Sequence, residues 1–293
     1  MAARNPRPVN ASSLEVHHLR STVLGLAKAS HFQPTLAVTA AATGLAVMAG
    51  RGVLGCIAVA LAVLCGQLST GWSNDWFDAA RDTEVGRMDK PIVAGMVTVR
   101  TVRASALIAI VLVGPLSLLS GWRAALIHVV AVGSAWAYNA GLKSTIVSPL
   151  PYGLSFALLP AFVTLGLPGH PWPRADIMVI TGLLGIGAHF INTLADRADD
   201  RSTGVRGLPQ RLPASVTLGV GVAVFAVCAC MIRSIGGRLP LLENLILAAS
   251  FGCDALVIGA VATDRPRAAW SWTLAATVAC LALFVVARPP LVT

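Results

Sequence analysis

The sequence predicts an all-α, polytopic membrane protein with about nine transmembrane helices around a central cavity. Two observations carry this prediction. Of the 293 residues, 56% are hydrophobic and only 12% are charged, about half the charged share of a soluble domain. The mean hydropathy is +0.74, which excludes an ordinary soluble protein and a disordered chain. Residues 1–293 are therefore expected to form a single integral-membrane domain, in which helices satisfy their own backbone groups within the lipid.

The apolar segments have the length that crosses a bilayer, roughly 20 residues. The run 144–173 is longer and rich in proline, so we expect one helix over about 150–167 followed by a loop. The eighth segment is interrupted by Asp254. The expected spans are 29–50, 52–74, 104–122, 124–142, 150–167, 177–195, 212–232, 241–262 and 268–287.

The distribution of basic residues predicts the orientation. Nine spans place the two termini on opposite sides, and a cytoplasmic N-terminus puts most of the 22 Lys and Arg residues in the cytoplasm. The basic residues left on the other side are Arg51, Arg123, Arg174, Arg233, Arg238 and Arg288. We expect a cytoplasmic N-terminal segment over residues 1–28, a cytoplasmic active site, and residence in the plasma membrane of a bacterium. We attribute the net charge of +9 to basic residues that orient the protein in the lipid bilayer. Binding of nucleic acid is not expected, since almost no soluble surface remains for it.

The acidic residues gather in two short segments, each of which follows a predicted span. The first holds Asp75, Asp78, Asp82, Glu84 and Asp89; the second holds Asp196, Asp199 and Asp200. Asn74, Asp78 and Asp82 have the i, i+4, i+8 spacing that lines one face of a helix. Asn192, Asp196 and Asp200 repeat that spacing. The repetition predicts two pseudo-repeated halves, each with one acidic helix end.

Carboxylates this close together repel one another unless a cation lies between them. Mg²⁺ suits such a site, because it typically takes one or two carboxylates together with the phosphates of a substrate. Basic residues beside both clusters could contact the remaining phosphate oxygens. The plain alternative is a solvated loop of mixed charge, and the matching spacing at two helix ends argues against it. Two acidic helix ends that meet over a cavity would therefore be suited to gripping a diphosphate.

Three stretches of the chain resemble the UbiA superfamily of intramembrane prenyltransferases. NDWFDAARDTEVGRMDKP (74–91) is similar to the first Asp-rich signature of that family, and NTLADRADDRSTGVRGLPQRL (192–212) is similar to the second. YNAGLKS (138–144) looks like the family's Tyr…Leu-Lys element. The likeness covers nearly the whole chain, since nine helices with acidic motifs after the second and sixth are the family's arrangement.

The resemblance implies a Mg²⁺-dependent enzyme that ionises an isoprenyl diphosphate and passes the allylic cation to a lipophilic or aromatic acceptor. By matching position, the metal ligands would be Asn74, Asp78, Asp82, Asp196 and Asp200. The substrate-binding residues would be Arg87, Lys90, Tyr138, Lys143, Asn192 and Arg201. Asp75 matches the signature but lies about 100° around the helix from Asn74, so it could instead orient a metal ligand or a basic residue. The second motif opens with Asn-Thr where the family has Asn-Asp, and Lys90–Pro91 replaces the usual Arg-Pro pair.

Two further polar residues are candidates from their position within spans. Asp254 lies midway along the eighth span, and an acidic residue inside a membrane is a candidate catalytic group; the alternative is a protonated carboxyl bonded to a neighbouring helix. His189 lies one turn before Asn192, so it could contact substrate in the same cavity or be a satisfied buried histidine.

The motifs leave three functions open. A prenyltransferase needs an acceptor, whereas a membrane terpene cyclase on the same fold needs only the prenyl diphosphate. A non-catalytic carrier of isoprenoid diphosphates could use the same acidic clusters without breaking a bond. The prenyltransferase is the leading interpretation.

Overall fold

The computed structural model describes residues 11–237 and 239–292, and within them helices are the only regular elements apart from one bridge between Pro173 and Val292. The prediction of an all-α fold is thereby confirmed. The helices are α1 (Ala11–Ala29), α2 (Phe32–Met48), α3 (Val53–Glu84), α4 (Val99–Leu118), α5 (Trp122–Ala140), η1 (Leu142–Ser144), α6 (Pro149–Thr164), α7 (Ala175–Ala195), α8 (Arg197–Ser202), α9 (Leu208–Arg211), α10 (Ala214–Ile235), α11 (Pro240–Ala262) and α12 (Pro266–Ala287).

Nine helices in the described part of the chain coincide with the nine expected spans. Six of these (α3, α4, α7, α10, α11 and α12) are long and apolar enough to cross a membrane, and α2 and α6 are shorter apolar helices. The ninth is α5. Local sequence sets several of the boundaries: proline occupies the first turn of α6, α11 and α12, where its missing N–H costs nothing. Thr98 caps α4 by accepting a hydrogen bond from the N–H of Thr101, 3.1 Å away.

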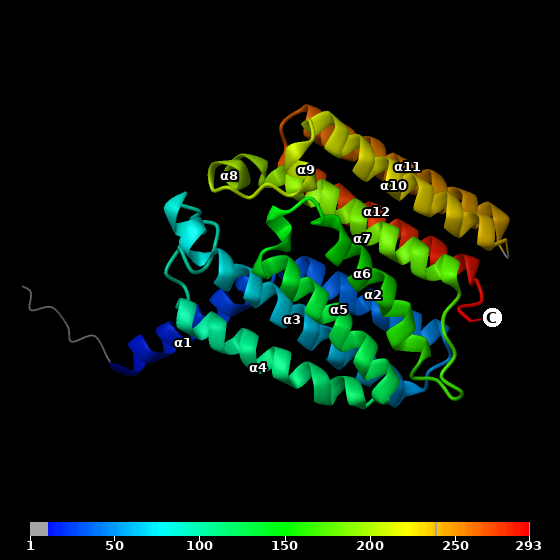
Figure 1. Ribbon diagram of the computed structural model, residues 1–293, viewed down its shortest axis with the longest axis horizontal. Coiled ribbons are helices and arrows are strands. Elements are labelled where there is room, and N and C mark those ends of the chain that lie inside the picture. Colours follow the sequence, from blue (N-terminus) through cyan, green and yellow to red (C-terminus); the bar gives the residue numbers. More distant parts are fainter. Residues whose placement is uncertain (1–10, 238, 293) are drawn as a thin grey trace, which may run out of the picture.

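The helices pack in a long bundle (Figure 1). α3 contacts α2, α4 and α5, while α6 lies between α5 and α7. α7 continues the packing to α10 and α12, and α11 contacts α10 and α12. Small residues permit the close approach of α6 and α7: a Cβ atom at Gly185 would lie 2.7 Å from the carbonyl oxygen of Tyr152. The core is built from apolar side chains of α2, α3, α6, α7, α10 and α12.

The two acidic motifs differ in their local structure. α3 continues past the expected span to Glu84, so Asn74, Asp78 and Asp82 share one continuous helix as predicted. α7 ends at Ala195, and Asp196 has φ −100° and ψ 6°, so the second triplet does not lie on a single helix as expected. Asp200 belongs instead to the short α8. The physical reason is visible at Arg197, whose guanidinium donates hydrogen bonds to the carbonyls of Pro209 and Leu212 and ties α8 to the chain around α9.

Candidate active site

The loop after α3 reaches the second acidic motif through one side chain, that of Arg87. Its guanidinium lies 3.1 Å from Asp196 and 3.9 Å from Asp199, and it also pairs with Asp89 at 3.0 Å. Burial alone would lower the pKa of Arg87, but the hydrogen bond that Arg87 donates to Asp89 and the charge of Asp196 raise it. Figure 1 shows this loop and the α8–α9 segment at the same end of the bundle. The two motifs, far apart in sequence, thus converge.

Asp78 is the buried centre of the first motif. It is 7% exposed and forms ion pairs with Lys143 from η1 and with Arg81, which lies 2.8 Å away one turn along α3. Burial lowers the pKa of Lys143 even though the carboxylate of Asp78 opposes this. The carboxylate of Asp78 therefore favours the charged form of Lys143.

Asp200 from the second motif interacts electrostatically with the same cations, Arg81 and Lys143. Burial and the nearby charge of Asp196 raise the pKa of Asp200, while a hydrogen bond from Gln210 and the charges of Arg81 and Lys143 oppose the rise. The Gln210 amide nitrogen lies 2.8 Å from the Asp200 carboxylate. The charges of Arg81 and Lys143, which also pair with Asp78 of the first motif, therefore lower the pKa of a carboxylate of the second motif.

An aromatic group lies beside these charges. Tyr138 interacts electrostatically with Asp78, Asp196 and Asp200, which belong to both motifs. Its ring centroid is 5.1 Å from that of Tyr152 and 5.4 Å from that of His189. Tyr152 and His189 are 4.8 Å apart. The polar site therefore has aromatic faces next to its carboxylates.

His189 and Asn192 enter this group from α7. His189 is fully buried, its Nε2 lies 3.1 Å from the Ser148 hydroxyl, and its Nδ1 has no hydrogen-bond partner among the described residues. Asn192 follows His189 by three residues on the same helix. Contact of both residues with substrate stays a prediction.

Asp75 contacts different residues from Asp78. It is 2% exposed, and one oxygen, Oδ1, accepts a hydrogen bond from Lys90 at 2.7 Å and lies 3.1 Å from His31 Nε2. Burial would lower the pKa of Lys90, but its pair with Asp75 raises that pKa. In the structure, Asp75 contacts basic groups rather than another carboxylate.

Asn74 is held by a residue that the sequence did not single out. Its amide nitrogen lies 3.2 Å from Asn139 Oδ1, and the Asn139 amide in turn donates to Ser73 Oγ at 2.8 Å. Arg81 is one of the basic residues beside the first cluster that the sequence offered as phosphate contacts. Other residues missed from the sequence are Tyr152, Gln210 and His31. Asn139 could have been found from its place beside Tyr138, whereas the other three are joined to the site only by the fold.

Two candidates lie outside this network. Arg201 is exposed and donates hydrogen bonds to the backbone carbonyl of Gln210, at 2.8 and 3.2 Å, rather than to a carboxylate. Asp254 is buried on α11, which packs on α10 and α12, and one of its oxygens has no hydrogen-bond partner among the described residues. The structure does not bring Asp254 together with either acidic motif.

The described carboxylates do not by themselves form a complete metal site. No group of three or more His, Cys, Asp or Glu side chains in residues 11–237 and 239–292 is arranged to hold a metal ion. Asp82 is 4% exposed and makes no ion pair with another described residue. Because Mg²⁺ commonly takes one or two carboxylates and completes its shell with phosphate oxygens and water, the residues present fit that cation.

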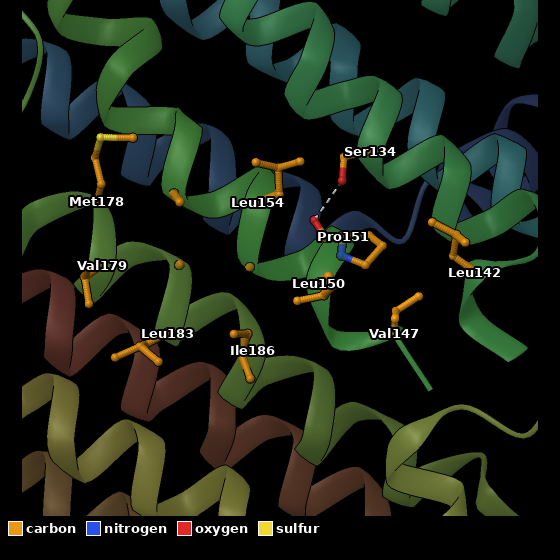
Figure 2. A pocket seen from close by; sticks show the side chains of 13 residues that line it. Ser134, Leu142, Val147, Leu150, Pro151, Leu154, Met178, Val179, Leu183 and Ile186 are labelled. Carbon is orange, nitrogen blue, oxygen red and sulfur yellow. Dashed lines mark hydrogen bonds between the residues drawn. The ribbon is translucent and has the colours of Figure 1, made fainter. Parts of the chain in front are cut away.

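An apolar cavity of about 550 Å³ lies on the flank formed by α5, α6 and α7 (Figure 2). None of the predicted site residues lines it, although its wall includes Leu142, which precedes Lys143. Figure 2 also shows the Ser134 hydroxyl directed at the carbonyl of Pro151, 3.3 Å away. The lining residues are Ser134, Leu142, Val147, Leu150, Pro151, Gly153, Leu154, Ala157, Met178, Val179, Gly182, Leu183 and Ile186.

The fold and the site together define a polytopic membrane protein with two acidic motifs, joined by the pair between Arg87 and Asp196, at one end of a helical bundle. The family model "UbiA prenyltransferase family" matches residues 32–238, more than half of the chain, so the chain belongs to the UbiA prenyltransferase family. The resemblance seen in the sequence is confirmed, and with it the integral-membrane character of the protein. A comparison with curated proteins found no match.

Solved structures share the fold at low sequence identity. A UbiA homologue from Aeropyrum pernix K1, solved in the apo state, is 18% identical with a TM-score of 0.67, covering 86% of this chain and 97% of the other. A UbiA homologue from Archaeoglobus fulgidus, bound to DMAPP and Mg²⁺, is 13% identical with a TM-score of 0.65, covering 88% and 99%. A structure concerning digeranylgeranylglyceryl phosphate synthase in membranes is 14% identical with a TM-score of 0.65, covering 91% and 98%.

Proposed function

We propose that this protein transfers a prenyl group from an isoprenyl diphosphate to a lipophilic or aromatic acceptor in a Mg²⁺-dependent reaction. The observation that carries the proposal is the convergence of the two motifs: Arg87 pairs with Asp196, and Arg81 and Lys143 act on both Asp78 and Asp200. The Archaeoglobus fulgidus homologue, with structures bound to DMAPP or GPP and Mg²⁺, supports the same ligand class.

The carboxylates and cations divide the work of binding the diphosphate. Asp78 and Asp82 would hold one Mg²⁺ together with Asn74, and Asp196 and Asp200 would hold another. When bound, Mg²⁺ stabilises negative charge on the departing diphosphate. Arg87, Lys90 and Lys143 supply N–H donors to the oxygens that remain, and donors to charged oxygens form the stronger class of hydrogen bond.

The aromatic side chains protect the other product, the allylic cation. Tyr138 and Tyr152 pack around His189 beside the carboxylates. Aromatic faces attract a cation, and a pocket closed to water prevents its hydrolysis. The proposed reaction then ends when an acceptor atom bonds to C1 of the prenyl group and loses its proton.

The orientation of the site follows from the charge distribution. We propose that the N-terminus and the carboxylates face the cytoplasm, in the plasma membrane of a bacterium, because basic residues are concentrated at that end. The apolar bundle below the carboxylates leaves the prenyl tail within the bilayer.

Product analysis tests this function. The purified protein in lipid nanodiscs would be given Mg²⁺, several prenyl diphosphates and a membrane lipid extract, and products would be identified by mass spectrometry. A prenylated acceptor that requires the extract supports the proposal. A hydrocarbon or terpene alcohol formed without the extract would show a terpene cyclase, and binding without release of diphosphate would show a carrier. Asp196→Asn is the matched inactive variant.

A further inference from the structure

The corner between α1 and α2 is seated tightly on α3, one helical turn from the acidic motif. A Cβ atom at Gly71 would lie only 2.5 Å from the carbonyl oxygen of Ser30, so the contact requires glycine at that position. The indole N–H of Trp72 donates a hydrogen bond to the carbonyl of Leu26, 2.9 Å away. Gly71 precedes Asp75 by four residues, so both lie on the face of α3 that meets this corner.

His31 forms the corner itself. Its backbone is left-handed, with φ 52° and ψ 59°, a conformation uncommon outside glycine but more accessible to histidine, asparagine and aspartate. The backbone N–H of His31 donates to the carbonyl of Lys28 at 3.1 Å, and its own carbonyl accepts from Thr35 at 3.2 Å. These bonds fix the turn.

The side chains of His31 and Lys90, a predicted diphosphate-binding residue, contact the same oxygen atom of Asp75. His31 Nε2 lies 3.1 Å from Asp75 Oδ1, and the ammonium group of Lys90 lies 2.7 Å from the same oxygen. Asp75 is 2% exposed, so water does not compete freely for this carboxylate. Lys90 also interacts electrostatically with Asp82, a residue of the first motif, and with Arg87.

We infer that His31 is a positioning residue: by holding Asp75 Oδ1, it fixes the carboxylate that aims Lys90 at the diphosphate. Lys90 belongs to a loop rather than to a helix, so its side chain depends on this contact for a defined place. The left-handed corner on Gly71 delivers the imidazole to Asp75. This inference rests on the proposed function, since it takes Lys90 as a ligand of the prenyl diphosphate.

The test is a double-mutant cycle on binding of inorganic pyrophosphate with Mg²⁺, measured by calorimetry on the full-length protein. His31→Asn retains a residue that accepts the left-handed backbone but is too short to reach Asp75. His31→Gln restores an N–H donor at about the original reach. Lys90→Met removes the group on which His31 acts.

We expect His31→Asn to weaken pyrophosphate binding by about 3- to 10-fold, as suits the loss of a hydrogen bond to a charged group, and His31→Gln to bind within about 2-fold of the wild type. In the Lys90→Met background, His31→Asn should change binding by less than about 2-fold, because the two residues act as one unit. Thermal unfolding of each variant would be recorded alongside.

Two results overturn the inference alone: an equal loss from His31→Asn in both backgrounds, which shows a general structural role, or no loss in either. Absence of Mg²⁺-dependent pyrophosphate binding in the wild type refutes the proposed function, and this inference with it. The cycle therefore separates the two failures.

Discussion

Replacing Arg87 by glutamine should impair substrate binding far more than it impairs folding. Arg87 is 19% exposed, but its partners Asp196, Asp199 and Asp89 are 40%, 52% and 54% exposed, so solvent screens these pairs. Pairs of that kind contribute about 0–1 kcal/mol to stability. A charged donor to a diphosphate contributes about 1.5–3 kcal/mol, which corresponds to about a 10- to 150-fold rise in the KM for the prenyl diphosphate.

The assay is steady-state turnover of labelled prenyl diphosphate by the protein in nanodiscs, with thermal unfolding as the measure of stability. Arg174→Gln is the matched control, because Arg174 pairs with Asp176 at 2.6 Å at the opposite end of α7. That variant should keep its KM. A KM for Arg87→Gln within about 2-fold of the wild type would refute the reasoning, as would an equal rise in Arg174→Gln.

Four further predictions follow from the same contacts. Asp78→Asn should abolish turnover and destabilise the protein by about 3–5 kcal/mol, because it leaves the buried Lys143 unpaired. Adding Lys143→Gln should restore the unfolding temperature but not turnover, and recovered turnover would exclude Asp78 as a metal ligand. Asp254→Asn should change turnover by less than about 3-fold, since the main contacts of α11 are with α10 and α12, away from both acidic motifs. A larger loss of turnover with an intact fold would show that Asp254 takes part in the reaction. Gly71→Ala should destabilise the protein by about 1–3 kcal/mol through overpacking against Ser30, whereas Gly133→Ala, with nothing within 4 Å of its Cβ, should not. Equal unfolding temperatures for the two variants would contradict the tight contact between Gly71 and Ser30. Chelation of Mg²⁺ should stop turnover and its return should restore it, with activity that survives chelation counting against metal-assisted ionisation.

The fold was accessible from sequence because hydropathy and length decide where a chain crosses a bilayer. The helix predicted over 150–167 occurs as α6, over Pro149–Thr164, since proline at its first turn and the loop after it mark both ends. The helical arrangement of the first acidic motif was equally predictable, because α3 continues as one helix through Asn74, Asp78 and Asp82. Periodicity and local composition were sufficient in both cases.

The second motif shows where periodicity fails. Its spacing matches the first, yet α7 ends before Asp196 and Asp200 lies on α8, where Arg197 donates hydrogen bonds to the carbonyls of Pro209 and Leu212 in and after α9. Contacts between distant segments have no local signal. The pair between Arg87 and Asp196, the corner at His31 and the hydrogen bond from Gln210 to Asp200 were therefore beyond sequence reasoning, although they form much of the site.

The most direct test counts how many diphosphates the two motifs bind and whether each motif is needed. Calorimetric titration of the protein with a non-cleavable prenyl thiodiphosphate and Mg²⁺ should give one site per chain, and either Asp82→Asn or Asp200→Asn alone should remove the Mg²⁺-dependent binding. Two independent sites per chain, each lost with its own motif only, would contradict the account.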